Sequence, residues 1–138
     1  MASIFSRIVK GEIPAYKIAE NDLFLAFLDI NPVAKGHTLV IPKKEIDYFF
    51  DLEDDLLANM MIFAKKVALA LDKAIECKRV GVMVVGTEVP HAHIHLVPFE
   101  TESQVCIVAP KLKLSQKEFE RIANKIREFI PEEISVRD

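Results

Sequence analysis

The amino-acid sequence predicts an α+β domain in which a meandering antiparallel sheet of about five strands packs against a long central helix and a C-terminal helix. Short apolar runs bounded by Gly, Pro, Asn and Asp alternate with longer segments whose apolar residues recur every three or four positions. The links between the expected strands are tight, which favours antiparallel neighbours over parallel strands joined by crossovers. The chain has 138 residues, so we expect residues 1–138 to form a single domain.

The first half of the chain predicts one short helix and three strands. Apolar residues at near-helical spacing within residues 4–14 predict a helix followed by a turn. Residues 16–19 and 24–30 are typical of a hairpin that turns at Asn21-Asp22. Residues 37–42, HTLVIP, predict a short buried strand.

The second half predicts two helices with two strands between them. Residues 52–77 form the longer helix, and its apolar stripe consists of Leu56, Met60, Phe63, Val67, Leu71 and Ala74. Strands are expected over residues 79–85 and 89–99. Ser115 and Glu118 form a capping box that begins the last helix, and the inward face of this helix comprises Phe119, Ile122, Ile126 and Phe129. We expect the helices to lie on one side of the sheet.

Composition excludes several classes of protein. A formal net charge of −3 argues against a general nucleic-acid binder, whose affinity comes largely from neutralising phosphates. The apolar stretches are far shorter than the roughly 20 residues that span a bilayer, and no signal peptide is recognisable, so we expect a cytoplasmic protein without a membrane partner. Cys77 and Cys106 are the only cysteines, and their separation favours neither a disulfide framework nor a cysteine-based zinc site.

The segment of residues 91–96, HAHIHL, is the most informative part of the sequence about its chemistry. Side chains alternate faces along a strand, so we expect His91, His93 and His95 to share one face. The opposite face, made of Ala92, Ile94 and Leu96, is apolar and suited to packing on a helix. Three imidazoles buried without hydrogen-bond partners are costly, so the histidine face needs polar surroundings or a ligand.

Three interpretations of this histidine face remain open. The three rings are satisfied structural histidines, or they bind a metal, or they act on a phosphate ester. Zinc accepts imidazole nitrogens, but the three positions extend over about 13 Å of strand at about 3.3 Å per residue, so a metal would need a further ligand such as His37 or Glu88. A neutral imidazole is a good nucleophile near pH 7, and its neighbours can hydrogen-bond to phosphate oxygens.

Three blocks of sequence, spread over roughly residues 3–99, resemble the histidine triad (HIT) family of nucleotide-binding hydrolases and transferases. The blocks are the opening segment from Ile4-Phe5 to Gly11-Glu12-Ile13-Pro14, the stretch from Phe27-Leu28-Asp29 to Pro42-Lys43, and the alternating histidines at 91, 93 and 95. The resemblance implies a HIT-like fold, similar to that of the histidine triad nucleotide-binding proteins.

The resemblance also implies a reaction and a set of catalytic residues. His93 is the expected nucleophile on the α-phosphorus of a purine nucleotide conjugate, either a nucleoside phosphoramidate or a dinucleoside polyphosphate, with a nucleotidyl-histidine intermediate. His91 and His95 would orient it, hold phosphate oxygens and handle the proton of the leaving group. His37 would complete their network. No cofactor is implied.

The nucleotide-binding residues and the assembly follow from the same resemblance. Asp29 would accept both ribose hydroxyls, as suits an acceptor-only carboxylate. The purine slot would comprise Phe5, Ile8, Ile13, Phe27, Ile30 and Leu39, of which we expect about half to touch the ligand. The family implies a homodimer, and we expect its seam along the 52–77 helix and the neighbouring strand.

The chain departs from the family pattern just before the histidines. Family members commonly have an Asn and a Gly-Gln or Gly-Gln-Ser element there, whereas residues 86–90 here read GTEVP. Thr87 and Glu88 take the places of Gln and Ser. Thr87 still donates one hydrogen bond, and Glu88 could favour a cationic or amine-bearing leaving group. This departure keeps two alternatives open: a nucleotide-binding module with little catalysis, and a metal-binding protein that uses the triad as ligands.

Overall fold

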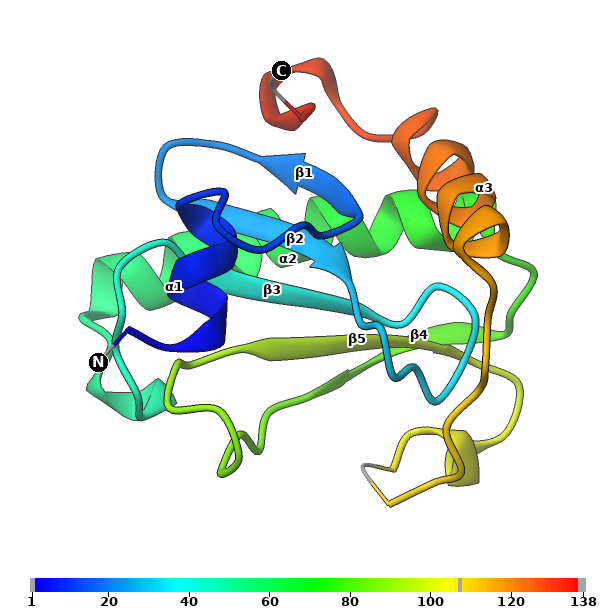
Figure 1. Ribbon diagram of the computed structural model, residues 1–138, viewed down its shortest axis with the longest axis horizontal. Helices are drawn as coiled ribbons and strands as arrows, with labels where there is room; N and C mark the ends of the chain where they lie inside the picture. The colour runs from blue at the N-terminus through cyan, green and yellow to red at the C-terminus, as the bar shows by residue number, and fades with distance from the viewer. Residues whose placement is uncertain (1, 107, 137–138) are drawn as a thin grey trace.

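The computed structural model describes residues 2–106 and 108–136 of the chain (Figure 1). In chain order its elements are α1 (Ile4–Val9), β1 (Lys17–Glu20), β2 (Phe24–Leu28), β3 (Thr38–Pro42), α2 (Asp54–Ala74), β4 (Arg79–Met83), β5 (Ile94–Phe99) and α3 (Gln116–Arg127). Three single-turn 3-10 helices, η1 (Phe49–Asp51), η2 (Glu102–Gln104) and η3 (Glu132–Ile134), complete the described elements. Every element type expected from the sequence is therefore present in the expected order.

The five strands form one antiparallel sheet in the order β1-β2-β3-β5-β4. This confirms the predicted α+β class with a five-stranded antiparallel sheet. β5 lies between β3 and β4 and contains His95, whereas His91 and His93 precede it. β4 is one edge strand of the sheet and β1 is the other.

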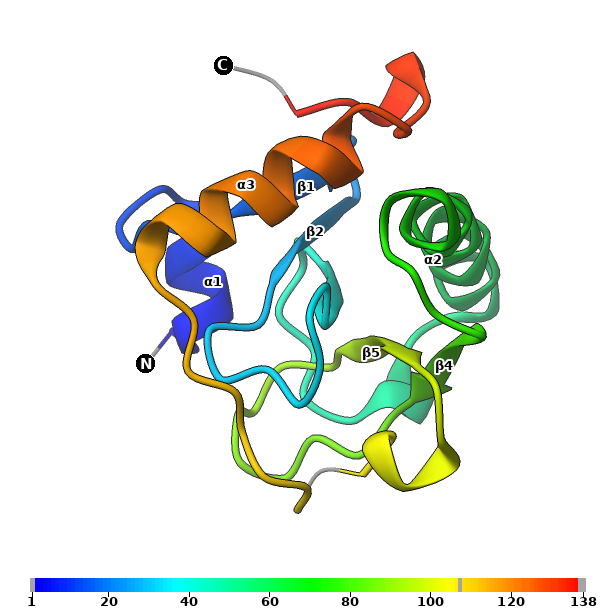
Figure 2. The ribbon, with the colours of Figure 1, turned by 90° about the vertical axis from the view of Figure 1, so that its right-hand side faces the viewer.

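The helices cover both faces of the sheet. α2 packs over one face and α1 over the other, and α3 lies at the β1 edge, where it also contacts α2 (Figure 2). The expectation that all helices lie on one side is wrong for α1. The reason is that β2 and β3 are buried on both faces, so their alternate side chains form a second apolar surface for α1.

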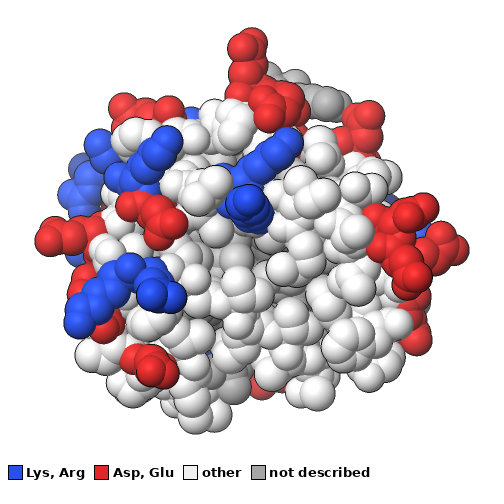
Figure 3. Space-filling view, turned by 180° about the vertical axis from the view of Figure 1, so that it is seen from behind, with Lys and Arg blue, Asp and Glu red and all other residues white. Residues whose placement is uncertain are grey.

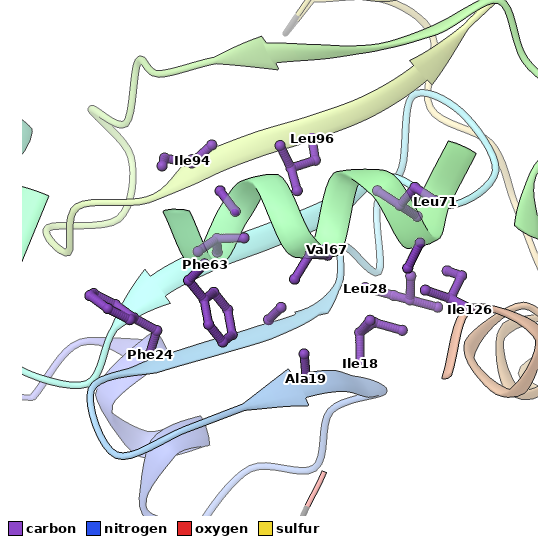
Figure 4. Packing of buried hydrophobic residues seen from close by; sticks show 14 of the residues in the cluster. Ile18, Ala19, Phe24, Leu28, Phe63, Val67, Leu71, Ile94, Leu96 and Ile126 are labelled. Atoms are coloured by element: carbon purple, nitrogen blue, oxygen red, sulfur yellow. The ribbon is translucent and has the colours of Figure 1, made fainter. Parts of the chain in front are cut away.

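The main core lies between the sheet and α2 (Figure 4). Ala92, Ile94 and Leu96 all belong to this core, which confirms the apolar face predicted for the histidine segment. Ser115 and Glu118 form the predicted capping box at the start of α3. Phe129 instead lies beyond the last turn of α3, where it is 37% exposed and Lys125 Nζ lies 5.5 Å from its ring centre, so its predicted place on the inward face is wrong.

Several element bounds differ from the prediction. The strand expected over residues 89–99 begins only at Ile94, because the His91 N–H donates to Val89 O and the Ala92 N–H donates to Ile46 O. These bonds make a turn instead of a ladder. α2 is two residues shorter at its start and three at its end than the predicted helix over 52–77. Among the described residues no helix is both long enough and apolar enough to cross a membrane.

Replacing Leu71 with alanine should test the α2 core. Leu71 is fully buried, so its truncation leaves a cavity that lowers the free energy of unfolding by about 2–5 kcal/mol. Leu23→Ala is the matched control, because Leu23 is 48% exposed in the β1–β2 turn and should cost well under about 1 kcal/mol. Chemical denaturation measures both. Equal effects from the two variants would contradict the described packing.

Candidate active site

A cavity of about 540 Å³ opens on the α1 face of the sheet. It is lined by eleven of the thirteen residues predicted from the sequence for the site: Phe5, Ile8, Ile13, Phe27, Asp29, Ile30, Leu39, Thr87, Glu88, His93 and His95. The other two, His91 and His37, lie behind the cavity wall and are almost completely buried. The structure therefore brings the predicted residues together, with two histidines supporting the others from behind.

The hydrogen bond made by His93 fixes which of its nitrogens holds a proton. His93 Nδ1 lies 2.8 Å from the carbonyl oxygen of His91. A carbonyl only accepts, so Nδ1 is the protonated nitrogen, and in the neutral ring Nε2 then carries a lone pair. His93 lines the cavity, and it is 6% exposed. The site thus holds one imidazole in the tautomer that a nucleophile requires.

The proton on His95 follows from a chain of hydrogen bonds that begins at the backbone. The Val33 N–H donates to His37 Nδ1 at 3.1 Å, so the proton of the neutral His37 ring is on Nε2. His37 Nε2–H then donates to His95 Nδ1 at 2.9 Å, which leaves His95 with its proton on Nε2. His95 Nε2 is buried and has no hydrogen-bond partner within residues 2–106 and 108–136. A buried N–H donor at a cavity wall is suited to binding an acceptor such as a phosphate oxygen.

Burial keeps the rings of His37 and His95 neutral. It lowers the pKa of His37 to about 4, with the positive charges of Lys111 and His93 acting in the same direction. Burial also lowers the pKa of His95 to about 4, again helped by neighbouring cationic forms. The relay from Val33 to His95 is therefore a chain of neutral donors and acceptors at physiological pH.

Asp29 stands at the end of β2, on the wall of the cavity near these rings. Its Oδ1 accepts the Asn31 N–H at 2.8 Å, and its Oδ2 lies 3.6 Å from His37 Nε2. The first bond orients the carboxylate and closes the turn after β2. Burial raises the pKa of this carboxyl, and the Asn31 N–H, His95, Lys111 and His93 oppose that rise. Asp29 thus presents hydrogen-bond acceptors to the cavity.

His91 joins three separate segments of the chain. Its Nε2 lies 2.7 Å from Pro42 O, so Nε2 donates and Nδ1 accepts the hydroxyl proton of Ser3 at 2.8 Å. Ser3 is also the N-cap of α1, where its hydroxyl accepts the Ser6 N–H. Both ring nitrogens of His91 are thus occupied, and its carbonyl accepts from His93. His91 can therefore act on the reaction through His93.

Glu45 extends this junction toward α1. Its Oε1 accepts the Ser3 N–H and the Ser6 hydroxyl, each at 2.6 Å. These bonds lower the pKa of Glu45 to about 2, so the carboxylate stays ionised. Sequence analysis missed Ser3, Ser6 and Glu45. Only the N-cap pattern of Ser3 was visible in the sequence, because the other contacts depend on how α1 meets the end of β3.

The apolar part of the cavity is built from α1, β2 and β3. The Phe5 ring packs edge-on against Phe27 with ring centres 5.6 Å apart, and edge-on against His93 at 5.0 Å. Ile8 and Leu39 belong to the same buried cluster, with Ile13 at its border. Ile30 lines the cavity but is 64% exposed. The apolar part of the cavity therefore lies directly beside the His93 imidazole.

The loop after β4 passes close to His93. Gly86 has a φ of +71°, and a Cβ at this position would lie 3.0 Å from His93 Cε1. Glycine is therefore required here for both its backbone conformation and its small size. The close approach places the following residues, Thr87 and Glu88, on the cavity wall.

One cluster of side chains in the site has the spacing of metal ligands. Among the described residues, ligand atoms of Asp29, His37 and His95 all lie within 4.8 Å of one another. A cation there would have to displace the proton shared by His37 and His95. His91 uses both ring nitrogens elsewhere, so the three triad rings do not converge on one point.

Comparisons with known proteins agree with this geometry. Residues 10–102 match the HIT domain. The chain belongs to the HIT family. An adenosine 5′-monophosphoramidase of Schizosaccharomyces pombe is 37% identical over 132 residues, which cover 91% of this chain and 96% of the relative. An uncharacterised HIT-like protein of Methanocaldococcus jannaschii is 42% identical over 107 residues, which cover 74% of this chain and 83% of the relative. The crystal structure of a Hit-like protein of Bartonella henselae is similar with a TM-score of 0.79 and 32% identity, over 93% of this chain and 96% of that one.

Lys111 is a charged cavity residue of this HIT protein that was not predicted from the sequence. Lys111 lies in the segment between η2 and α3 and lines the cavity together with Asp29 and His95. The sequence around it, Pro110-Lys111-Leu112-Lys113, contains no motif that distinguishes Lys111 from an ordinary surface lysine. Its place at the site depends on how this segment crosses the sheet.

We expect the free energy of unfolding to fall as the pH is lowered from about 6.5 to about 4. His37 and His95 hold a pKa of about 4 when folded, against about 6.5 in an unfolded chain, so the unfolded state binds more protons within this window. Burial lowers the pKa of His91 and adds to the loss. The raised pKa of Asp29 acts in the opposite direction.

Denaturant titrations across this pH range measure the effect, and NMR titration of the ring protons assigns it to His37 and His95. A midpoint near about 6.5 for either ring would contradict the buried neutral relay.

Proposed function

We propose that this protein is a nucleotide hydrolase that cleaves purine nucleotide conjugates at the α-phosphorus, with His93 Nε2 as the nucleophile. The observation that supports this most strongly is the 2.8 Å contact between His93 Nδ1 and His91 O. It leaves the Nε2 lone pair available in a residue that lines the cavity. The S. pombe relative is named an adenosine 5′-monophosphoramidase, which supports a nucleoside phosphoramidate as the substrate class.

The proposed reaction has two displacement steps. The His93 Nε2 lone pair forms a bond to the α-phosphorus while the bond to the leaving group breaks, and that group departs with its electron pair and takes a proton from water. The His93 ring then carries a positive charge, because Nδ1 keeps its proton, and the His91 carbonyl stabilises this charge. Water next attacks the phosphorus and loses a proton to solvent. The nitrogen–phosphorus bond breaks, which releases the nucleoside monophosphate and restores the neutral His93 ring.

His95 serves in this proposal as a hydrogen-bond donor and not as a source of protons. Its ring is neutral at physiological pH, since its pKa is lowered to about 4, mainly by burial. A neutral imidazole N–H donates a hydrogen bond but does not readily give up the proton. His95 Nε2–H thus stabilises a phosphoryl oxygen as negative charge develops on it. Its buried, unpartnered state among the described residues supports this role.

The remaining cavity residues position the nucleoside. The purine occupies the slot that includes Phe5 and Phe27, and the ribose hydroxyls donate to Asp29. Support comes from the lining of a single cavity, which includes Phe5 and Phe27, the carboxylate of Asp29, and the two histidines His93 and His95. No cofactor takes part in this reaction. The cytoplasmic location and the single-domain organisation stay predictions from the sequence.

Replacing His93 with alanine should abolish turnover of adenosine phosphoramidate, with a loss of about 10³-fold or more, because no second nucleophile replaces it. The affinity for AMP should change only a few-fold, since the base and ribose contacts lie elsewhere. The wild-type protein, incubated with labelled substrate in a single turnover, should give an acid-labile and base-stable nucleotidyl adduct that is absent from the variant.

Three outcomes of this experiment would contradict the proposal. A parallel loss of AMP binding and turnover would show that His93 does not act mainly as the nucleophile. Tight binding of substrate by the wild type without turnover would favour a nucleotide-binding module. Activity that a chelator removes and zinc restores would favour a metal-dependent reaction.

We also propose that the protein is a homodimer that associates along β4 and α2. β4 is an edge strand of the sheet. Val82 on β4 pairs with Leu96, so the Val82 side chain faces the same side of the sheet as α2, and Val82 is 54% exposed there. On α2, Met61, Ile62 and Leu69 are 41%, 55% and 51% exposed. Seen from behind the view of Figure 1, most charged side chains lie toward the rim, a basic group stands just above the centre, and uncharged side chains fill most of the lower part (Figure 3). An exposed apolar edge of this kind favours association.

Light scattering should therefore give a mass twice that of the chain. Val82→Glu should shift the protein toward the monomer, because the seam would have to bury an unpaired charge. Leu23→Glu, at an exposed turn away from β4, should leave the mass unchanged. A monomeric wild type at micromolar concentration would contradict this proposal.

A further inference from the structure

The carboxylates of the cavity outnumber its lysine, although the proposed ligand is an anion. Of the described residues that line it, Asp29 and Glu88 carry negative charges, and Lys111 is the one with a permanent positive charge. His95 is neutral at physiological pH because burial lowers its pKa. An anionic phosphate therefore enters a cavity whose carboxylates and lysine sum to a net charge of −1, and Lys111 is the group that offsets their repulsion.

The backbone around Lys111 is held against the wall of the site. On one side of it, Ala109 packs against the buried cluster of Val33, Ala34 and Val97. On the other side, the Leu112 N–H donates to Pro32 O at 2.7 Å. Lys111 thus lies between two fixed points, beside the turn that follows Asp29.

The groups that respond to the Lys111 charge show which part of the cavity it serves. Its charge opposes the rise that burial causes in the pKa of Asp29, and it adds to the lowering that burial causes in the pKa of His37 and His95. Under the proposed function, the ribose lies at Asp29 and the phosphorus lies between His93 and His95. This phosphorus is that of the 5′-phosphate, so the oxygens of the 5′-phosphate lie beside His95 and next to the ribose at Asp29, where the Lys111 charge acts.

We infer that Lys111 binds the oxygens of the 5′-phosphate of the nucleotide and thereby replaces the neutral donors that the short loop 86–90 lacks. A lysine ammonium is a compact charge that binds phosphate without requiring one fixed geometry. Because the 5′-phosphate stays with the nucleoside throughout, Lys111 acts on substrate, intermediate and product alike. This inference rests on the proposed function for the orientation of the nucleotide.

The inference is tested by comparing the binding of AMP with that of neutral adenosine. Lys111→Gln should weaken AMP binding by about tenfold, since a hydrogen bond to a charged group is lost. Adenosine binding should change less than about twofold, because it has no phosphate to lose. The loss for AMP should shrink at high salt, where exposed charges are screened. In turnover, KM should rise while kcat changes little.

Three control variants separate charge from structure. Lys113→Gln removes the same charge two residues away at an exposed position that does not line the cavity, so AMP binding should be unchanged. Lys111→Arg should retain most of the AMP affinity. Glu88→Gln should strengthen AMP binding, since it removes a negative charge from the same wall.

Two results would overturn the inference: Lys111→Gln with wild-type AMP affinity, or equal weakening of AMP and adenosine. A wild type that binds AMP no better than adenosine would also overturn it. Failure of the proposed function would give a different result. In that case the wild type would bind AMP through Lys111 but would form no nucleotidyl adduct on His93.

Discussion

The hydrogen bond from His93 Nδ1 to the His91 carbonyl is the interaction on which the chemistry of this protein depends. A neutral imidazole has one donor and one acceptor nitrogen, so a bond that fixes the donor also fixes the position of the lone pair. The bond is possible because the chain turns at residues 89–92 before β5 begins. A regular strand over residues 89–99 would have directed the His91 carbonyl into the ladder. The shortened strand is therefore a condition for the role of nucleophile that we propose for His93.

The same turn links the reaction centre to the base slot. His91 holds the N-terminus of α1 through Ser3, and Glu45 holds Ser3 and Ser6 from the end of β3. α1 in turn supplies Phe5, whose ring contacts His93 on one side and Phe27 on the other. A displacement of α1 would thus alter the slot and the nucleophile together. His91 orients the His93 ring, and His37 orients the His95 ring. Of the four histidines, only His93 and His95 therefore line the cavity.

The parts of this structure that depend on local sequence patterns could be predicted from the sequence. Alternation placed Ala92, Ile94 and Leu96 in the core, and the capping box at Ser115 began α3 as expected. The predicted purine-slot residues also all line one cavity. The position of α1 could not be predicted in the same way, because an apolar stripe does not show which face of the sheet it covers. Glu45 and Lys111 could not be predicted, because a single charged residue belongs to no repeating pattern and the residues near it in the fold are distant in the sequence.

The neutral state of the histidines creates a second requirement for the site. Burial of His37 and His95 favours uncharged rings, which keeps the relay of donors fixed and leaves the neighbouring lone pair undisturbed. Uncharged rings, however, give little attraction to an anionic phosphate, and the two carboxylates on the cavity wall oppose it. A site that gains reactivity by keeping its histidines neutral must therefore take its positive charge from a residue outside the triad. Since Lys111 lies on a separate segment from the strands that carry the histidines, its charge can offset the carboxylates without protonating the nucleophile. Under the proposed function, reactivity and affinity for the phosphate thus belong to different parts of the chain.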